Sequence, residues 1–129
     1  MRRAIEINPN FYDPYYPLSE LWIRSRKYEE AEKLLVAPFR EDKENWQWPY
    51  QLGLCYGGMR EWDKGISMAQ LALKHKNSPA KIHLLLADLH SNKGERSKAI
   101  SELEAFLKRE PESPMARRAR EVLQQLRQK

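Results

Sequence analysis

The sequence has little of what several classes of protein require. Its single cysteine, Cys55, excludes an intrachain disulfide and a cysteine-based zinc site, and fits either a reducing or an oxidising compartment. Its three histidines, His75, His83 and His90, have no further ligands at metal-site spacing beside them. No apolar run approaches the ~20 residues of a membrane-spanning helix, and no signal-peptide pattern opens the chain. We therefore expect no metal, no cofactor and no membrane span.

Catalytic signatures are missing as well. The chain has no Gly-x-Ser-x-Gly motif, no glycine-rich phosphate loop and no Cys–His pairing pattern. Gly57-Gly58 is better explained by the end of a helix or by close packing of the backbone. Carboxylates such as Glu29, Glu30 and Glu102 lie near lysines, as on a solvated helix surface. The sequence therefore predicts a protein that is not an enzyme.

The residues that are abundant favour helices. Leucine, alanine, glutamate, lysine and arginine dominate a chain that has only five glycines. Hydrophobic residues make up 41% and charged residues 32%, which is a globular rather than a disordered composition. The length of 129 residues suits one domain. An all-α domain is therefore the fold class to test.

Small residues recur along the chain at a fixed interval. In each unit a leucine is followed by a small residue, and a large residue stands three places after the small one. The small and large residues are Ser19 and Trp22, Gly53 and Tyr56, and Ala87 and His90. A second small residue stands twelve places later, at Ala31, Gly65 and Ala99. Both series advance by 34 residues, which is the signature of a stacked repeat architecture. One unit cannot bury its apolar face alone, so neighbouring units must pack together.

This spacing resembles the tetratricopeptide repeat family. The resemblance covers nearly the whole chain and implies one all-α domain, a right-handed superhelical solenoid of three helix-turn-helix repeats with a C-terminal capping helix. The expected repeats are residues 12–45, 46–79 and 80–113. Residues 1–9 resemble the end of a preceding repeat helix, and residues 114–127 are the expected capping helix.

Capping and breaking residues predict where single helices begin and end. Asp13 followed by Pro14 is typical of an N-cap with proline at the first helical position, so the first helix should open there. The second helix should run from about Tyr28 to Pro38, since a proline removes a main-chain donor, and residues 39–45 should be irregular. Further helices are expected near residues 47–59, 62–74, 79–92, 96–108 and 114–127.

The two ends of the chain differ in their apolar pattern. Ala116, Ala119, Val122, Leu123 and Leu126 form one amphipathic stripe opposite a polar face, as the last helix of an array needs for solubility. The first residues provide only the end of a helix. We therefore expect a piece of a larger soluble protein, cytoplasmic or extracytoplasmic, whose apolar N-terminal edge can pair with a second copy.

The resemblance also implies a binding surface, because the first helix of each tetratricopeptide unit lines a concave groove. The matching positions in this sequence are Tyr16, Glu20, Arg24, Gln47, Tyr50, Leu54, Lys81, Leu84, Asp88 and Asn92. Tyr16, Tyr50 and Leu84 recur at the repeat interval and should form a stripe along the groove. Tyrosine suits such a face because it offers a large area, a hydroxyl group and little entropy loss. The alternative is that some of these tyrosines only pack between repeats.

Two functions fit such an array. The first is a scaffold that binds a peptide segment or a partner domain, with apolar contacts giving affinity and charges giving discrimination. The alternative is RNA binding, because 23 Lys and Arg against 18 Asp and Glu give a net charge of +5. The basic excess gathers near the C-terminus, however, while Glu20 and Asp88 fall at groove positions. We therefore expect a protein or peptide partner rather than nucleic acid.

Overall fold

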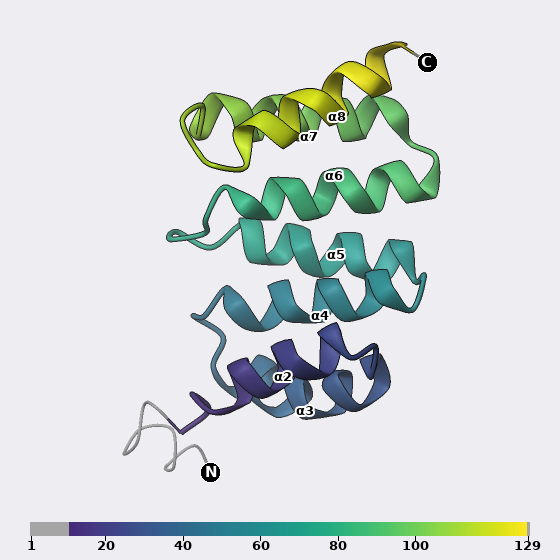
Figure 1. The fold of residues 1–129 in the computed structure, drawn as a ribbon. Helices are drawn as coiled ribbons and strands as arrows, with labels where there is room; N and C mark the ends of the chain where they lie inside the picture. The colour runs from purple at the N-terminus through teal and green to yellow at the C-terminus, as the bar shows by residue number, and fades with distance from the viewer. Residues whose placement is uncertain (1–10, 129) are drawn as a thin grey trace.

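Stacked helical hairpins make up the structure, a computed structural model that describes residues 11–128 (Figure 1). The helices within this range are α2 (Tyr15–Arg24), α3 (Tyr28–Glu41), α4 (Gln47–Gly58), α5 (Trp62–Leu73), α6 (Lys81–Lys93), α7 (Arg96–Arg109) and α8 (Ala116–Gln128). The pairs α2–α3, α4–α5 and α6–α7 are the three expected repeats, and α8 packs on α7. This is the predicted all-α solenoid. None of the described helices is long and apolar enough to cross a membrane.

The helices form two layers with different spacing. In the layer of first helices, α2 contacts α4 and α4 contacts α6 directly. The second helices, α3, α5 and α7, make little or no contact with one another and are held apart by the first helices between them. The inner layer of a curved stack has the closer spacing, so α2, α4 and α6 line the inner face. The helices α3, α5 and α7 form the outer face.

Small residues set the distance between the two helices of a repeat, as predicted. In the second repeat, a Cβ atom added to Gly53 would lie 3.4 Å from the carbonyl oxygen of Gly65, and one added to Gly65 would lie 3.3 Å from that of Gly53. The corresponding residues of the other repeats, Ser19, Ala31, Ala87 and Ala99, are also buried. Large apolar side chains such as Leu85 and Leu89 from the next repeat then pack over the crossing.

Every repeat turns between its helices in the same way. The turn residue has a positive φ in each case: 64° at Arg26, 63° at Arg60 and 92° at Gly94. The next N–H donates to the carbonyl oxygen five residues back, from Lys27 to Trp22, from Glu61 to Tyr56 and from Glu95 to His90, at 2.7–2.8 Å. This is the left-handed helix ending that favours glycine. Only the third repeat has glycine there.

Arg60→Gly is therefore expected to stabilise the protein by about 0.5–1 kcal/mol, because a left-handed conformation costs an L-residue more than the added chain entropy of glycine. Chemical denaturation of both forms measures the difference. Ser67→Gly, at an exposed position in the middle of α5, is the control and should lose about 0.5 kcal/mol. A loss of stability in Arg60→Gly would contradict this account of the turn.

Two local predictions are wrong. The helix α3 does not stop at Pro38: it runs to Glu41, because the Pro38 side chain is buried in the core and its carbonyl oxygen accepts the Asp42 N–H at 2.8 Å. The Tyr12 hydroxyl also donates to the Glu41 carboxylate at 2.8 Å, which holds the extra turn. Asp13 is not the N-cap, since α2 begins at Tyr15 with Pro14 as cap residue and no capping side chain. Elsewhere the predicted helix ends differ by one or two residues.

The two ends of the stack expose different faces. On α8, Arg120 and Glu121 stand one repeat interval after Leu86 and Ala87, and both are exposed. The face that receives a second helix in the other repeats is thus polar here, as in a capping helix. On α2, Leu18 is 37% exposed, whereas its counterparts Leu52 and Leu86 are 3% and 0% exposed. The edge at α2 is therefore apolar; the helix end predicted for residues 1–9 lies outside the described residues, and pairing with a second copy stays a prediction.

Candidate functional site

The inner face has a pocket of about 150 Å³ where α2, α4 and the start of α6 meet. Its lining consists of Tyr16, Glu20, Ile23, Arg24, Tyr50, Gln51, Leu54 and Lys81. Six of the ten predicted site residues are therefore brought together: Tyr16, Glu20, Arg24, Tyr50, Leu54 and Lys81. They come from all three repeats, at positions that the repeat interval aligns on one face.

The pocket has a cationic side, where Lys81 contacts aromatic rings, and an acidic side, where Glu20 lies beside Tyr16. The Lys81 ammonium group lies 5.0 Å from the centre of the Tyr50 ring and 5.5 Å from that of Trp46, and the two rings meet edge to face at 5.7 Å. Across the pocket, burial raises the pKa of Tyr16, and the neighbouring Glu20 carboxylate raises it further. Burial likewise raises the pKa of Tyr50. Both hydroxyls therefore keep their protons at neutral pH, between a cationic side and an acidic side.

The side-chain amide of Gln51 is buried beside the pocket, and none of the described residues donates a hydrogen bond to its oxygen. The Ser19 hydroxyl donates to the carbonyl oxygen of Tyr16 at 2.8 Å, so its oxygen accepts the Gln51 Nε2–H at 2.9 Å. This chain of bonds fixes the orientation of the Gln51 amide. Its Oε1 atom is buried and has no partner among the described residues. Leaving such an acceptor unpaired costs about 1–3 kcal/mol, and because Gln51 is only 1% exposed this cost falls on the stability of the fold.

The inner face continues toward the C-terminus as a second, larger hollow of about 400 Å³ between α6 and α8. Leu84 and Asp88, two more predicted site residues, line it. The last two predicted residues line neither hollow: Gln47 is half-buried at the start of α4, and Asn92 is exposed and donates to the Asp88 carbonyl oxygen at 2.8 Å. The predicted set is thus split between two hollows and their margins.

The contribution of α8 to the inner face was not predicted from the sequence. Arg118 and Val122 of α8, with Met115 in the turn just before it, line the second hollow. They stand 34 residues after Lys81, Leu84 and Asp88, so the repeat interval could have found them if it had been extended into the capping helix. The helix therefore has two roles: it covers α7, and it presents a fourth row of side chains to the inner face.

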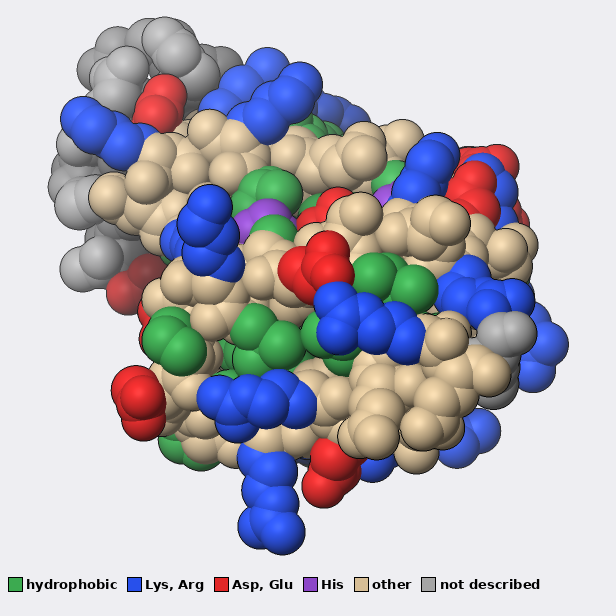
Figure 2. Space-filling model, turned by 90° about the horizontal axis from the view of Figure 1, so that it is seen from above, with side chains coloured by type: hydrophobic (Ala, Val, Ile, Leu, Met, Phe, Trp, Pro, Cys, Tyr) green, Lys and Arg blue, Asp and Glu red, His purple; other side chains and the backbone are tan. Residues whose placement is uncertain are grey.

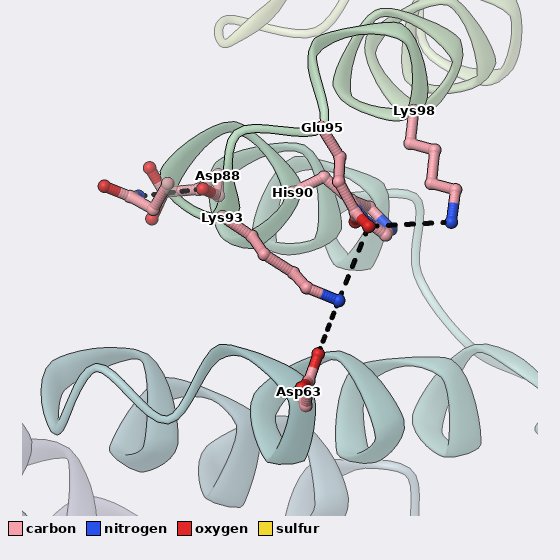
Figure 3. A network of polar contacts seen from close by, with 7 residues as sticks. Asp63, Asp88, His90, Lys93, Glu95 and Lys98 are labelled. Atoms are coloured by element: carbon pink, nitrogen blue, oxygen red, sulfur yellow. Dashed lines mark hydrogen bonds and ion pairs between the residues drawn. The ribbon is translucent and has the colours of Figure 1, made fainter.

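A polar network links the second and third repeats, as Figure 3 shows. The Lys93 ammonium group contacts Asp63 at 2.6 Å and Glu95 at 3.4 Å, while the His90 Nδ1 atom lies 2.7 Å from Glu95. The hydrogen bond with His90, followed by the contacts with Lys93 and Lys98, lowers the pKa of Glu95. The network joins α5 to the α6–α7 turn. Since the Asp63 side chain is 81% exposed, the network adds only a modest contact between the second and third repeats.

The remaining reactive side chains have structural surroundings. His83 contacts Glu102 at 2.8 Å between α6 and α7, so His83 and His90 occupy helix-packing positions as expected. Burial raises the pKa of the Cys55 thiol to about 12, and the Glu32 charge adds to the effect, so the thiol is not a nucleophile at neutral pH. Within residues 11–128, no group of three His, Cys, Asp or Glu side chains could hold a metal ion.

Helical pairs in a 34-residue register, with an inner face lined by their first helices, define a tetratricopeptide-type repeat fold. No protein-family model and no curated protein sequence matches this chain. Solved structures do match it. The type III secretion chaperone SycD of Yersinia enterocolitica, in complex with a peptide of the translocator YopD, is 22% identical with a TM-score of 0.85, covering 95% of this chain and 96% of that chain.

Two further structures have the same fold. One is PcrH in complex with the chaperone-binding region of PopD, at 16% identity and a TM-score of 0.84, which covers 92% of each chain. The other is the first tetratricopeptide domain of human RPAP3, at 18% identity and a TM-score of 0.83, covering 94% of this chain and 93% of that chain. At these identities the likeness shows the shared fold. The resemblance found in the sequence is thereby confirmed at the level of structure.

Proposed function

We propose that this chain is a non-catalytic scaffold that binds a segment of a partner protein along the inner face of α2, α4, α6 and α8. The observation that carries the proposal is the inner pocket, which combines an apolar floor at Tyr50 and Leu54 with Glu20 on one side and Lys81 on the other. An apolar floor gives affinity, and opposed charges select the orientation of a segment.

The comparisons support the same use of the fold. SycD and PcrH are each described in complex with a segment of another protein, a YopD peptide in one case and the chaperone-binding region of PopD in the other. This chain covers more than nine-tenths of both structures. A peptide or an unfolded region of a partner is therefore the kind of ligand that we expect here.

RNA binding fits the surface less well. Figure 2, which views the molecule from the end that carries α8, shows Lys and Arg side chains interleaved with Asp and Glu and with hydrophobic patches. Several arginines of this end are already engaged: Arg117 and Arg118 contact Glu121, and Arg127 contacts Glu104. A surface that tracks phosphates would instead be a continuous basic stripe.

Selection from a displayed library of random dodecapeptides tests the proposed function. The wild-type protein is expected to enrich peptides that bind with affinities little changed by salt, because apolar contacts dominate the pocket. Labelled single-stranded RNA, titrated at low and high salt, is the competing probe. Tight RNA binding with a steep salt dependence, together with no enriched peptide, would overturn the proposal.

Gln51→Leu separates binding from stability. The next repeat has Leu85 at the equivalent, buried position, so leucine fits the fold there. We expect the free protein to be as stable as the wild type or more stable, because the unpaired acceptor is removed. Groove-selected peptides should bind with little change in affinity, because the amide is buried beneath the pocket surface. Calorimetric titration and denaturation measure the two effects, and a loss of stability in the variant would contradict this account of the buried amide.

A further inference from the structure

A mainly apolar hollow is present on the outer face, away from the proposed groove. A cleft of about 550 Å³ lies between α3 and α5, with α4 as its floor. Its apolar lining includes Val36 and Phe39 of α3, Pro49 and Leu52 of α4, and Met68 and Leu71 of α5. Val36 is 39% exposed and Phe39, Met68 and Leu71 are half-buried, so their apolar surface is open to solvent. Packing among residues 11–128 leaves this surface uncovered.

The next repeat shows that the fold does not require an apolar cleft at this place. One repeat interval on, Val36 corresponds to Gln70, Pro49 to His83 and Met68 to Glu102. There the imidazole of His83 lies 2.8 Å from the Glu102 carboxylate and joins α6 to α7. The same scaffold therefore accepts polar residues at these positions and joins its helices there with a hydrogen bond. The apolar residues between α3 and α5 need another explanation.

Charge at one end of the cleft indicates what could cover it. Arg40 and Lys43 line that end, and both are exposed. Neither forms an ion pair with a carboxylate of residues 11–128. The one acidic residue in the lining, Asp42, already accepts the Trp48 Nε1–H at 3.0 Å and an Asn45 Nδ2–H at 3.3 Å. The end of the cleft thus offers two cations to an incoming anion.

We propose that this outer cleft is a second binding site, which takes a segment of a partner protein that carries large apolar side chains beside a carboxylate. The apolar side chains would pack between α3 and α5, and the carboxylate would meet Arg40 and Lys43. A groove between two helices is a common seat for an amphipathic segment. Because the cleft is on the outer face, it can be occupied while the inner groove is also filled, and the array would then join two segments.

The double variant Val36→Gln and Met68→Glu tests this site with residues that the fold already carries at positions 70 and 102. Peptides selected from the dodecapeptide library on the wild type are rebound to this variant and to Tyr50→Ala. We expect one class, rich in Leu, Phe or Met with Asp or Glu, to lose about tenfold or more on the double variant and little on Tyr50→Ala. Arg40→Glu should weaken the same class.

The result that overturns the outer site is the absence of any peptide class weakened by the double variant, or a weakened class that lacks acidic residues and ignores Arg40→Glu. Analytical sedimentation tests whether a second copy of the chain occupies the cleft instead. If the wild type is a dimer and the double variant is a monomer, a second copy covers the cleft and the proposal is overturned. If the double variant does not fold, Val36→Gln alone replaces it, since Val36 is largely on the surface. Loss of the Tyr50-dependent class concerns only the inner groove, so the two failures are distinguishable.

Discussion

Tyr50→Ala is expected to weaken the binding of groove-selected peptides by roughly 30-fold, which corresponds to the ~2 kcal/mol typical of a tyrosine at the centre of an interface. The Tyr50 ring lies in the inner pocket between the three repeats, against Trp46 and under the Lys81 ammonium group. Removing it takes away the apolar floor and frees Lys81 from the ring. Titration calorimetry on both proteins measures the loss.

Two variants show whether this loss belongs to the site. Tyr50→Phe keeps the ring and should bind within about threefold of the wild type if contact area carries the affinity. Tyr28→Ala removes a partly buried tyrosine from the first turn of α3, outside the groove, and should leave binding unchanged. Normal binding by a folded Tyr50→Ala protein would count against the groove as the site.

Gly65→Leu should give the largest loss of stability, about 3 kcal/mol or more, because it overpacks the crossing of α4 and α5. A Cβ atom at this position would already lie 3.2 Å from a methyl group of Leu89 and 3.3 Å from the Gly53 carbonyl oxygen. The rest of a leucine side chain has no room unless the two helices separate. Since α4 and α6 both carry groove residues, binding should be lost together with stability.

Gly65→Ala is the matched control. Alanine occupies the equivalent positions, Ala31 and Ala99. Its helix propensity is better than that of glycine by about 1 kcal/mol, which offsets the cost of the tight Cβ contact. Urea denaturation should therefore place Gly65→Ala near the wild type and Gly65→Leu far below it. Equal stability of the alanine and leucine variants would mean that close approach at residue 65 is not what sets the helix spacing.

The helical hairpins could be predicted because several independent residues recur at the same 34-residue interval. One small residue says little, but Ser19, Gly53 and Ala87 at equal spacing require three equivalent helix crossings. The same interval placed Tyr16 and Tyr50 on one face, and both line the inner pocket. The register therefore placed most of the predicted groove residues along the two hollows, although Gln47 and Asn92 line neither.

Predictions that rested on single residues were less successful. A proline usually ends a helix, yet Pro38 is within α3 because its ring fills a core position, and packing there outweighs one lost hydrogen bond. Asp13 has a side chain that suits an N-cap, but the N-cap position of α2 is occupied by Pro14. Tertiary packing decides such cases, and the sequence does not show it.

The features that were missed depend on pairs of residues distant in the chain. The unpaired Gln51 oxygen follows from a hydrogen bond to Ser19, 32 residues away. The outer cleft follows from apolar residues on α3 and α5 whose counterparts in the next repeat are polar. Comparing the repeats position by position would have shown that these residues are apolar in one repeat and polar in the next. It would not have shown the cleft between α3 and α5.

Amide chemical-shift mapping tests the central claim most directly. Isotope-labelled protein is titrated with the tightest peptide from the library, and the residues whose signals move are placed on the fold. The account predicts the largest changes at Tyr16, Tyr50, Leu54 and Lys81 on the inner face, with smaller ones toward Arg118 on α8. Peptides that all leave α2, α4 and α6 undisturbed would contradict it.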